Sequence, residues 1–228
     1  MSKTYPGRAG FGLALVIVVS APGNADPVAC PDARFQTLGA DDVADQICEI
    51  ATRTAAQLAT CNLDVKGPVL FELVDMLPDE CLGIFHCGDQ RIEIEHPDAY
   101  ATRLAHGRSG AFSPVSPEAF FESVIRHELA HVALQSLPCP FDNCIVRQEY
   151  IAYTMQGRFI PAADIAAFEA VDPVDGPVSR DTLNPIILMM APDLFARRAW
   201  QHLTERDDPC AFIGQIASAQ VLLDYERP

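Results

Sequence analysis

Two histidines lie four residues apart in the chain, and a glutamate directly follows the first of them: His127, Glu128 and His131. The segment 120–134 around them contains neither glycine nor proline, and the serine–proline pair that begins at Ser116 is typical of a helix start. We therefore expect a helix, in which positions i and i+4 share one face. Two imidazoles at this spacing can bind one zinc ion. Glu128 would reach the far side of the metal and take a proton from water.

These residues could instead form a solvated helix face or a hydrogen-bonded core pair, without any metal. Phe120, Val124 and Leu134 lie on the same stripe as the two histidines, so the pattern indicates that this face is buried. Burying two imidazoles without partners costs free energy, whereas metal binding satisfies both of them. The burial pattern therefore favours a zinc site over a purely structural role.

A catalytic zinc ion usually has three protein ligands and an open fourth position. Two acidic residues downstream are candidates for the third ligand. Asp142 lies in a predicted turn between two prolines and the next helix. Glu149 lies on the helix that we expect over residues 144–158, which returns from that turn.

This arrangement resembles that of the gluzincin metallopeptidases, in which an HExxH motif is followed by a zinc-binding glutamate on a second helix. The resemblance covers residues 127–153 well, and the preceding order of helix and strands loosely. It implies a zincin-like fold in which His127, His131 and Glu149 bind zinc. It also implies that Glu128 is the general base of peptide hydrolysis.

Two related patterns fit less well. The metzincin pattern requires a glycine and a histidine at positions where this chain has Leu134 and Leu137. Asp142 would give an aspzincin-like arrangement, but the motif that surrounds the ligand in that family is absent. No named peptidase family matches over the full length, so the sequence implies no substrate specificity.

The chain also departs from the thermolysin-like members of the gluzincins. Those have asparagine directly before the ligand glutamate and aspartate four residues after it, where this chain has Gln148 and Tyr153. Tyr153 could accept the ring N–H of His127, donate to a transition-state oxyanion, or simply pack in the core. Tyr150 and His202 are weaker oxyanion candidates.

The elements expected upstream must position this site. A capped helix is expected over 41–60, and strands are expected over 69–74, 82–86 and 91–95, the last two joined by a hairpin turn. The last strand alternates isoleucine with charged residues, which suits a sheet edge that could align an extended peptide. We expect residues 97–115 to form a loop.

The C-terminal third is expected to be helical. After the helix over 144–158, a short helix is expected over 162–170, and proline-marked starts near residues 184, 191 and 208 predict three more. The fold class is therefore α+β: a small mixed sheet packed on the HExxH helix, followed by a mostly helical part.

The first 25 of the 228 residues have the pattern of a secretory signal, with Lys3 and Arg8 before an apolar run over 11–19 and small residues at its end. We predict that residues 26–228 form a single domain. Cys30 fits a lipoprotein anchor poorly, because the usual leucine three residues upstream is absent.

All eight cysteines follow this signal, and an even number in an exported chain predicts four disulfides. Cys139 and Cys144 flank the two-proline reversal and are expected to bond to each other. Cys48 and Cys61 lie about 20 Å apart on one predicted helix, at 1.5 Å per residue, so they cannot bond to each other.

The chain is acidic, with a formal net charge of -15 at pH 7. Without Lys3 and Arg8 the remaining chain has 14 basic and 31 acidic residues, a net charge of -17. This balance argues against binding to nucleic acid or to an anionic membrane surface.

Together these patterns predict a secreted or periplasmic zinc hydrolase, a metallopeptidase that acts on peptides or proteins and has no membrane segment once the signal is removed. The alternative from another class is a zincin-fold binding or inhibitor protein that keeps zinc without turnover.

Overall fold

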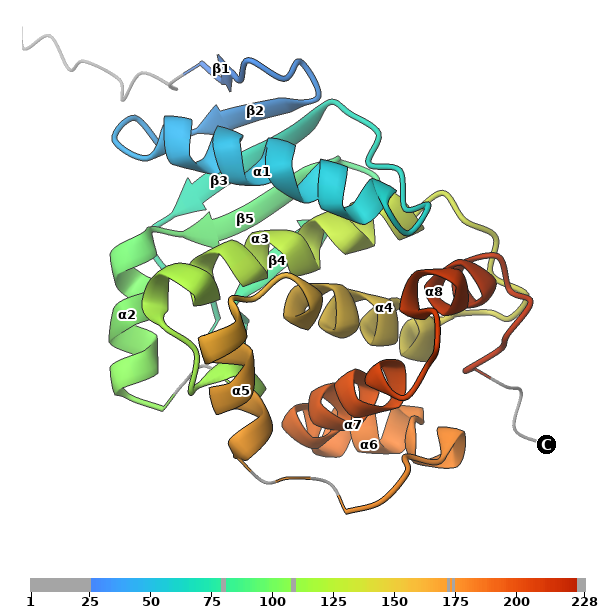
Figure 1. Ribbon diagram of the computed structural model, residues 1–228. Helices are drawn as coiled ribbons and strands as arrows, with labels where there is room; N and C mark the ends of the chain where they lie inside the picture. Colours follow the sequence, from blue (N-terminus) through green and yellow to red (C-terminus); the bar gives the residue numbers. More distant parts are fainter. Residues whose placement is uncertain (1–25, 79–80, 108–109, 172, 174, 225–228) are drawn as a thin grey trace, which may run out of the picture.

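The computed structural model describes residues 26–78, 81–107, 110–171, 173 and 175–224. The predicted signal, residues 1–25, lies outside the described residues. Within them the fold is α+β, as expected, with a five-stranded mixed sheet and a mostly helical C-terminal part (Figure 1). The strands are β1 (Val28–Ala29), β2 (Phe35–Leu38), β3 (Val69–Val74), β4 (Gly83–His86) and β5 (Arg91–Glu95). The helices of the described chain are α1 (Ala44–Ala59), α2 (Pro97–Ala105), α3 (Pro117–Leu134), α4 (Ile145–Arg158), α5 (Ala162–Ala170), α6 (Pro185–Met190), α7 (Pro192–Thr204) and α8 (Pro209–Ala217), with 3-10 turns η1 (Gly110–Phe112) and η2 (Arg180–Thr182).

The strand order is β1-β2-β3-β5-β4. The three inner strands are parallel to one another, and the two outer strands, β1 and β4, are antiparallel to their neighbours. The expectation that the strand 91–95 is a sheet edge is wrong, because β5 pairs with β3 on one side and β4 on the other. The alternation of isoleucine and charged residues in β5 indicates instead that one face of the sheet is buried and the other is closer to solvent. On the wet face Arg91 forms ion pairs with Glu72 and Glu93.

Helix α3 lies between the sheet and the C-terminal helices, which explains its high apolar content. Figure 1 shows α1 and α3 on the same face of the sheet, with α4 to α8 on the far side of α3. Phe120, Val124 and Leu134 are all buried, as their shared stripe predicts. The HExxH segment therefore sits in the middle of the molecule, and its position is fixed by packing on several sides.

The segment expected as a loop, 97–115, contains α2 and η1 instead. His96 caps α2 by accepting the backbone N–H of Asp98, and a proline stands at the first helical position. Arg103 of α2 is buried because its guanidinium forms an ion pair with Glu95, 2.6 Å from N to O. Because one of the buried positions of α2 is an arginine, the pattern of apolar residues that would predict this helix is weak in the sequence.

Three disulfides are present among the described residues: Cys30–Cys48, Cys61–Cys210 and Cys139–Cys144. The last confirms the predicted pair. The fourth bond implied by the even count is not among them, and the two other cysteines, Cys81 and Cys87, lie on either side of strand β4.

Disulfides of this kind are typical of proteins in oxidising compartments outside the cytosol. None of the helices in the described ranges has the length and apolar character needed to cross a membrane.

Candidate metal centre

Helices α3 and α4 pack against each other and bring three ligand-type side chains together. His127 Nε2 and His131 Nε2 lie 3.1 Å apart. The carboxylate of Glu149 lies 3.6 Å from the first nitrogen and 3.5 Å from the second. This is a group that could hold a metal ion, with all ligand atoms within 4.8 Å of one another. Asp142 belongs to no such group within the described residues, so the geometry favours Glu149 as the third ligand.

The position of Glu149 depends on where α4 begins, and two interactions fix that point. The Cys139–Cys144 disulfide closes the reversal immediately before the helix, with 5.8 Å between its Cα atoms. The carboxylate of Asp224, distant in sequence, accepts the backbone N–H groups of Val146 and the residue after it, each at 2.9 Å. These bonds satisfy donors that a helix start otherwise leaves without partners. The first turn of α4 is therefore anchored at both the reversal and the C-terminal segment.

A short chain of hydrogen bonds sets the tautomer of His127. Ser123 Oγ donates to the carbonyl oxygen of Phe120 at 2.7 Å, so its lone pairs can accept from Gln156 Nε2, at 3.1 Å. This leaves Gln156 Oε1 facing His127 Nδ1 at 3.0 Å. Because an amide oxygen can only accept, Nδ1 carries the proton. The lone pair of Nε2 is then directed toward His131 and Glu149, as a metal ligand requires.

Gln156 is the site residue that sequence reasoning missed. One hypothesis gave the role of accepting the His127 N–H to Tyr153, four residues after Glu149. The structure gives it to Gln156, seven residues after Glu149 and so two turns further on the same face of α4. The seven-residue spacing is visible in the sequence and would have made Gln156 a candidate.

Removing the Gln156 amide should weaken metal binding without unfolding the protein. We expect Gln156→Ala to lower zinc affinity by about 10–100-fold, the usual effect of losing a group that orients a ligand histidine. Competition with a chromophoric chelator measures this affinity. Gln215→Ala, an exposed position on α8, is the matched control and should bind zinc as the wild type does. An unchanged affinity for Gln156→Ala would show that the amide does not orient His127.

Glu128 is buried beside the edge strand β4. Its carboxylate lies so close to Gly83 that a Cβ atom at that position would come within 2.8 Å of Glu128 Oε1, so only glycine fits there. The backbone N–H of Phe85 donates to the same carboxylate. Burial, assisted by the negative charge of Glu149, raises the pKa of Glu128 to about 7. A carboxyl group with this pKa can both accept and release a proton near neutral pH.

Tyr153 packs with its ring edge against His127, with 4.8 Å between the ring centroids, and lines the same cavity as Glu128. Burial, followed by the nearby carboxylates of Glu149 and Asp193, raises the pKa of Tyr153 above its ordinary value. The hydroxyl group therefore keeps its proton at neutral pH and remains a hydrogen-bond donor.

A cavity of about 660 Å³ opens next to the metal-binding residues. Its lining residues come from α3 and α4, from the start of β4 and the residues before it, from η1, and from the end of α6 and the start of α7. The lining includes His127, Glu128, Tyr153 and Gln156 from α3 and α4, and Met189, Met190, Pro192 and Asp193 from the end of α6 and the start of α7. The cavity gives a substrate direct access to Glu128 and His127.

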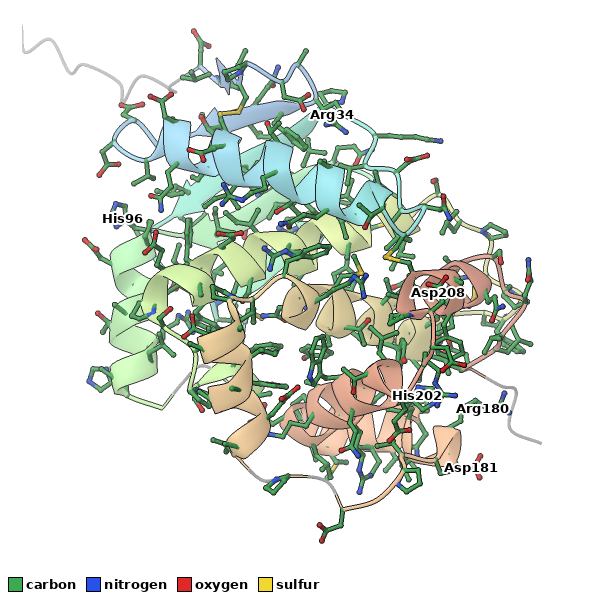
Figure 2. All side chains as sticks on the ribbon, in the orientation of Figure 1. Arg34, His96, Arg180, Asp181, His202 and Asp208 are labelled. Carbon is green, nitrogen blue, oxygen red and sulfur yellow. A yellow bond between two sulfur atoms is a disulfide. The ribbon has the colours of Figure 1, made fainter. Side chains whose placement is uncertain are left out.

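Tyr150 and His202, the weaker oxyanion candidates, lie outside this cavity. The Tyr150 hydroxyl bonds His202 Nδ1 at 2.9 Å, and both residues are buried. Figure 2 shows His202 on the C-terminal helices, where α7 approaches α8. The pair is therefore part of the helical core and not of the candidate site.

The buried imidazole of His202 should make folding depend on pH. Burial, with a further contribution from the charge of Arg206, lowers the pKa of His202 to about 4 from 6.5. The folded state thus resists protonation, so the associated stability is complete above pH 6.5 and is lost as the pH falls toward 4. A shift of this size corresponds to up to about 3 kcal/mol.

The double variant Tyr150→Phe/His202→Leu removes both partners of this hydrogen bond. We expect it to lose less stability than the wild type between pH 6.5 and 4, by up to about 3 kcal/mol, in urea unfolding at stepped pH. His106→Gln, at an exposed histidine, should follow the wild-type profile. Superimposable profiles for the double variant and the wild type would contradict the assignment.

Comparison with known proteins gives a family but no activity. No curated protein and no solved structure matches the chain. One family model, described as a family of unknown function (DUF6639), matches residues 37–226, a range that includes the metal-binding group and the whole cavity. Because this match covers most of the chain, the protein belongs to the DUF6639 family.

Proposed function

We propose that the protein is an exported zinc-dependent hydrolase, a metallopeptidase of zincin-like fold with His127, His131 and Glu149 as zinc ligands. The observation that carries this proposal is the convergence of the three side chains: the two Nε2 atoms lie 3.1 Å apart, Glu149 Oε2 lies 3.6 Å from His127 Nε2, and Glu149 Oε1 lies 3.5 Å from His131 Nε2. Ligands about 2.0–2.1 Å from a tetrahedral zinc ion lie about 3.3–3.4 Å apart. The set of two imidazoles and one carboxylate, all from helices, is of the type that binds catalytic zinc, and its ligand atoms lie within 4.8 Å of one another.

Each side chain around the cavity has a role in this proposal. Zinc, when bound, would act as a Lewis acid on a substrate carbonyl and lower the pKa of water to about 7. Glu128 would take the proton of the attacking water and deliver it to the leaving amine, which its pKa of about 7 allows. The Tyr153 hydroxyl would donate a hydrogen bond to the oxyanion that develops on the carbonyl oxygen.

The position of edge strand β4 supports the proposal that the substrate is a polypeptide. Its first residue lines the cavity, and within the described sheet it has a neighbour, β5, on one side only. Backbone groups on the open edge of a strand can pair with an extended peptide. The alignment role that the sequence suggested for residues 91–95 is therefore proposed for β4 instead.

The three disulfides support export to a secreted or periplasmic location. The acidic net charge of -15 supports a peptide or protein substrate rather than nucleic acid.

A zincin-fold binding or inhibitor protein, which would keep zinc without turnover, is the second candidate. The observation that favours it is Gln156, because a neutral amide orients His127, whereas thermolysin-like peptidases use an aspartate at the position that Tyr153 has here. A carboxylate in this place raises the basicity of the histidine ligand, and an amide does so less.

Incubation of the zinc-loaded protein with an unbiased peptide library, followed by mass spectrometry, distinguishes the two candidates. We expect cleavage that disappears when a chelator removes the zinc and returns when zinc is added back. A zinc-loaded, folded protein that leaves every peptide intact would contradict the hydrolase and favour the binding protein.

A further inference from the structure

The cavity that Glu128 lines also contains exposed methionines. Helix α6 is apolar along its whole length, yet Ile186, Met189 and Met190 are 54%, 77% and 80% exposed. Leu188 is the buried residue of this helix, and Met189 and Met190 line the cavity. Large apolar side chains gathered at a cavity rim mark binding surfaces more often than accidental exposure. Methionine in particular adapts its shape to apolar partners.

Two further residues that line the cavity are apolar as well. Phe112 of η1 and Val124 of α3 line it and are buried in the core, so they are held in place. Adaptable methionines and fixed core residues that line one cavity can enclose a large apolar side chain. The slot lies beside Glu128, where the reacting bond would be.

The cavity lining also contains a carboxylate that is close in sequence to the two methionines. Asp193, in the first turn of α7, lines the cavity and faces Gly110, at which a Cβ atom would lie 3.0 Å from its Oδ1. Among the described residues no ion pair or hydrogen bond of this carboxylate is present. Arg197, one turn further along α7, donates instead to the carbonyl oxygens of Phe168 and Ala111, at 2.7 and 3.0 Å. The negative charge of Asp193 is therefore available to a ligand.

The charge of the whole chain adds to this local one. The net charge is -15, and Asp193 is the carboxylate of the cavity lining that is outside the motif of the metal-binding helix. A cleft that carries one sign of charge attracts ligands of the opposite sign and raises their rate of association.

We propose that the cavity selects cationic peptides with a large apolar side chain next to the scissile bond. The apolar side chain packs between the α6 methionines and Phe112, and a lysine, an arginine or a free amino group within two residues of it pairs with Asp193. This inference rests on the proposed peptidase function and names its substrate class.

Four peptides of one scaffold test the inference. They combine either leucine or serine next to the scissile bond with either lysine or glutamate two residues away. We measure kcat/KM with the zinc-loaded wild type, and binding by fluorescence anisotropy with Glu128→Gln, which is expected to bind without cleaving. The leucine–lysine peptide should be preferred in both measurements.

Two cavity variants should each lose one preference. Met189→Ser/Met190→Ser should lower the preference for leucine over serine about tenfold, the scale of losing apolar contact with a substrate. Asp193→Asn should lower the preference for lysine over glutamate about three- to fivefold, as expected for a solvent-accessible charge pair. Met76→Ser, at a residue 77% exposed outside the cavity, and Asp181→Asn are the matched controls and should change neither preference. Figure 2 shows Asp181 at the outer edge of the helical part.

The outcomes separate this inference from the proposed function. If the wild type cleaves the peptides but the cavity variants keep both preferences, the inference is overturned and the peptidase function stands. Preferences in binding that depend on Met189, Met190 and Asp193, with no cleavage by the wild type, would support the selectivity and overturn the peptidase. Equal binding and cleavage of all four peptides would overturn the inference directly.

Discussion

Replacing Glu128 by glutamine should abolish peptide hydrolysis while zinc content and thermal unfolding stay close to those of the wild type. The two side chains are nearly the same size, and the Glu128 carboxylate is not among the three grouped ligands. An amide cannot accept the proton of the attacking water, and losing a general base typically lowers the rate by about 10²–10⁴-fold. Initial rates with a peptide found in the library, together with zinc analysis of the same samples, measure both effects.

Glu118→Gln provides the matched control, because Glu118 lies on the same helix but is exposed to solvent in its first turn. This variant should cleave at the wild-type rate. If Glu128→Gln also cleaves at a rate near that of the wild type, Glu128 is not the general base.

Replacing Glu149 by alanine should lower zinc affinity far more than the same change at Asp142. The Glu149 carboxylate lies within 3.6 Å of both histidine nitrogens, with Oε2 near His127 and Oε1 near His131, whereas Asp142 lies in the reversal before α4 and belongs to no ligand group within the described chain. We expect a loss of more than about 100-fold for Glu149→Ala, beyond the 10–100-fold cost of losing an outer-shell partner. Competition with a chromophoric chelator measures both variants against the wild type.

Asp142→Ala serves as the control, since it removes an equal charge at an exposed residue of the reversal before α4. A zinc affinity that falls equally in the two variants, or further in Asp142→Ala, would reassign the third ligand. Thermal unfolding with and without zinc adds a second measurement, because a ligand that binds only the folded state raises its stability.

The ligands of α3 could be predicted because their relation is local. A helix without glycine or proline places residues four apart on one face, so His127 and His131 meet whatever the rest of the chain does. Glu149 required more, namely a reversal between two helices, and the prolines and cysteines at the turn made that reversal visible. Gln156 was missed because its role depends on how α4 packs against α3 and on the hydroxyl of Ser123.

The errors in the sheet and in α2 have the same origin. Alternation of apolar and charged residues in 91–95 reports which face of the strand is buried, but it does not report which strands lie on either side. Helix α2 buries Tyr100 and Arg103, and the second of these forms an ion pair with Glu95. Such a pairing between distant elements leaves no periodic signal in the sequence.

The cavity wall is also invisible in the sequence. Every residue of the segment 185–190 is apolar, and a prediction from apolar content alone would bury the whole segment. The structure buries Leu188 and exposes Met189 and Met190, and the short helix packs on both α7 and α4.

Anomalous diffraction at the zinc absorption edge, from crystals of the purified protein, tests the central claim most directly. The account predicts one anomalous peak per chain, about 2.0–2.2 Å from His127 Nε2, His131 Nε2 and a carboxylate oxygen of Glu149. A zinc-loaded crystal with no peak between these three side chains, or with its peak at other residues, would contradict it.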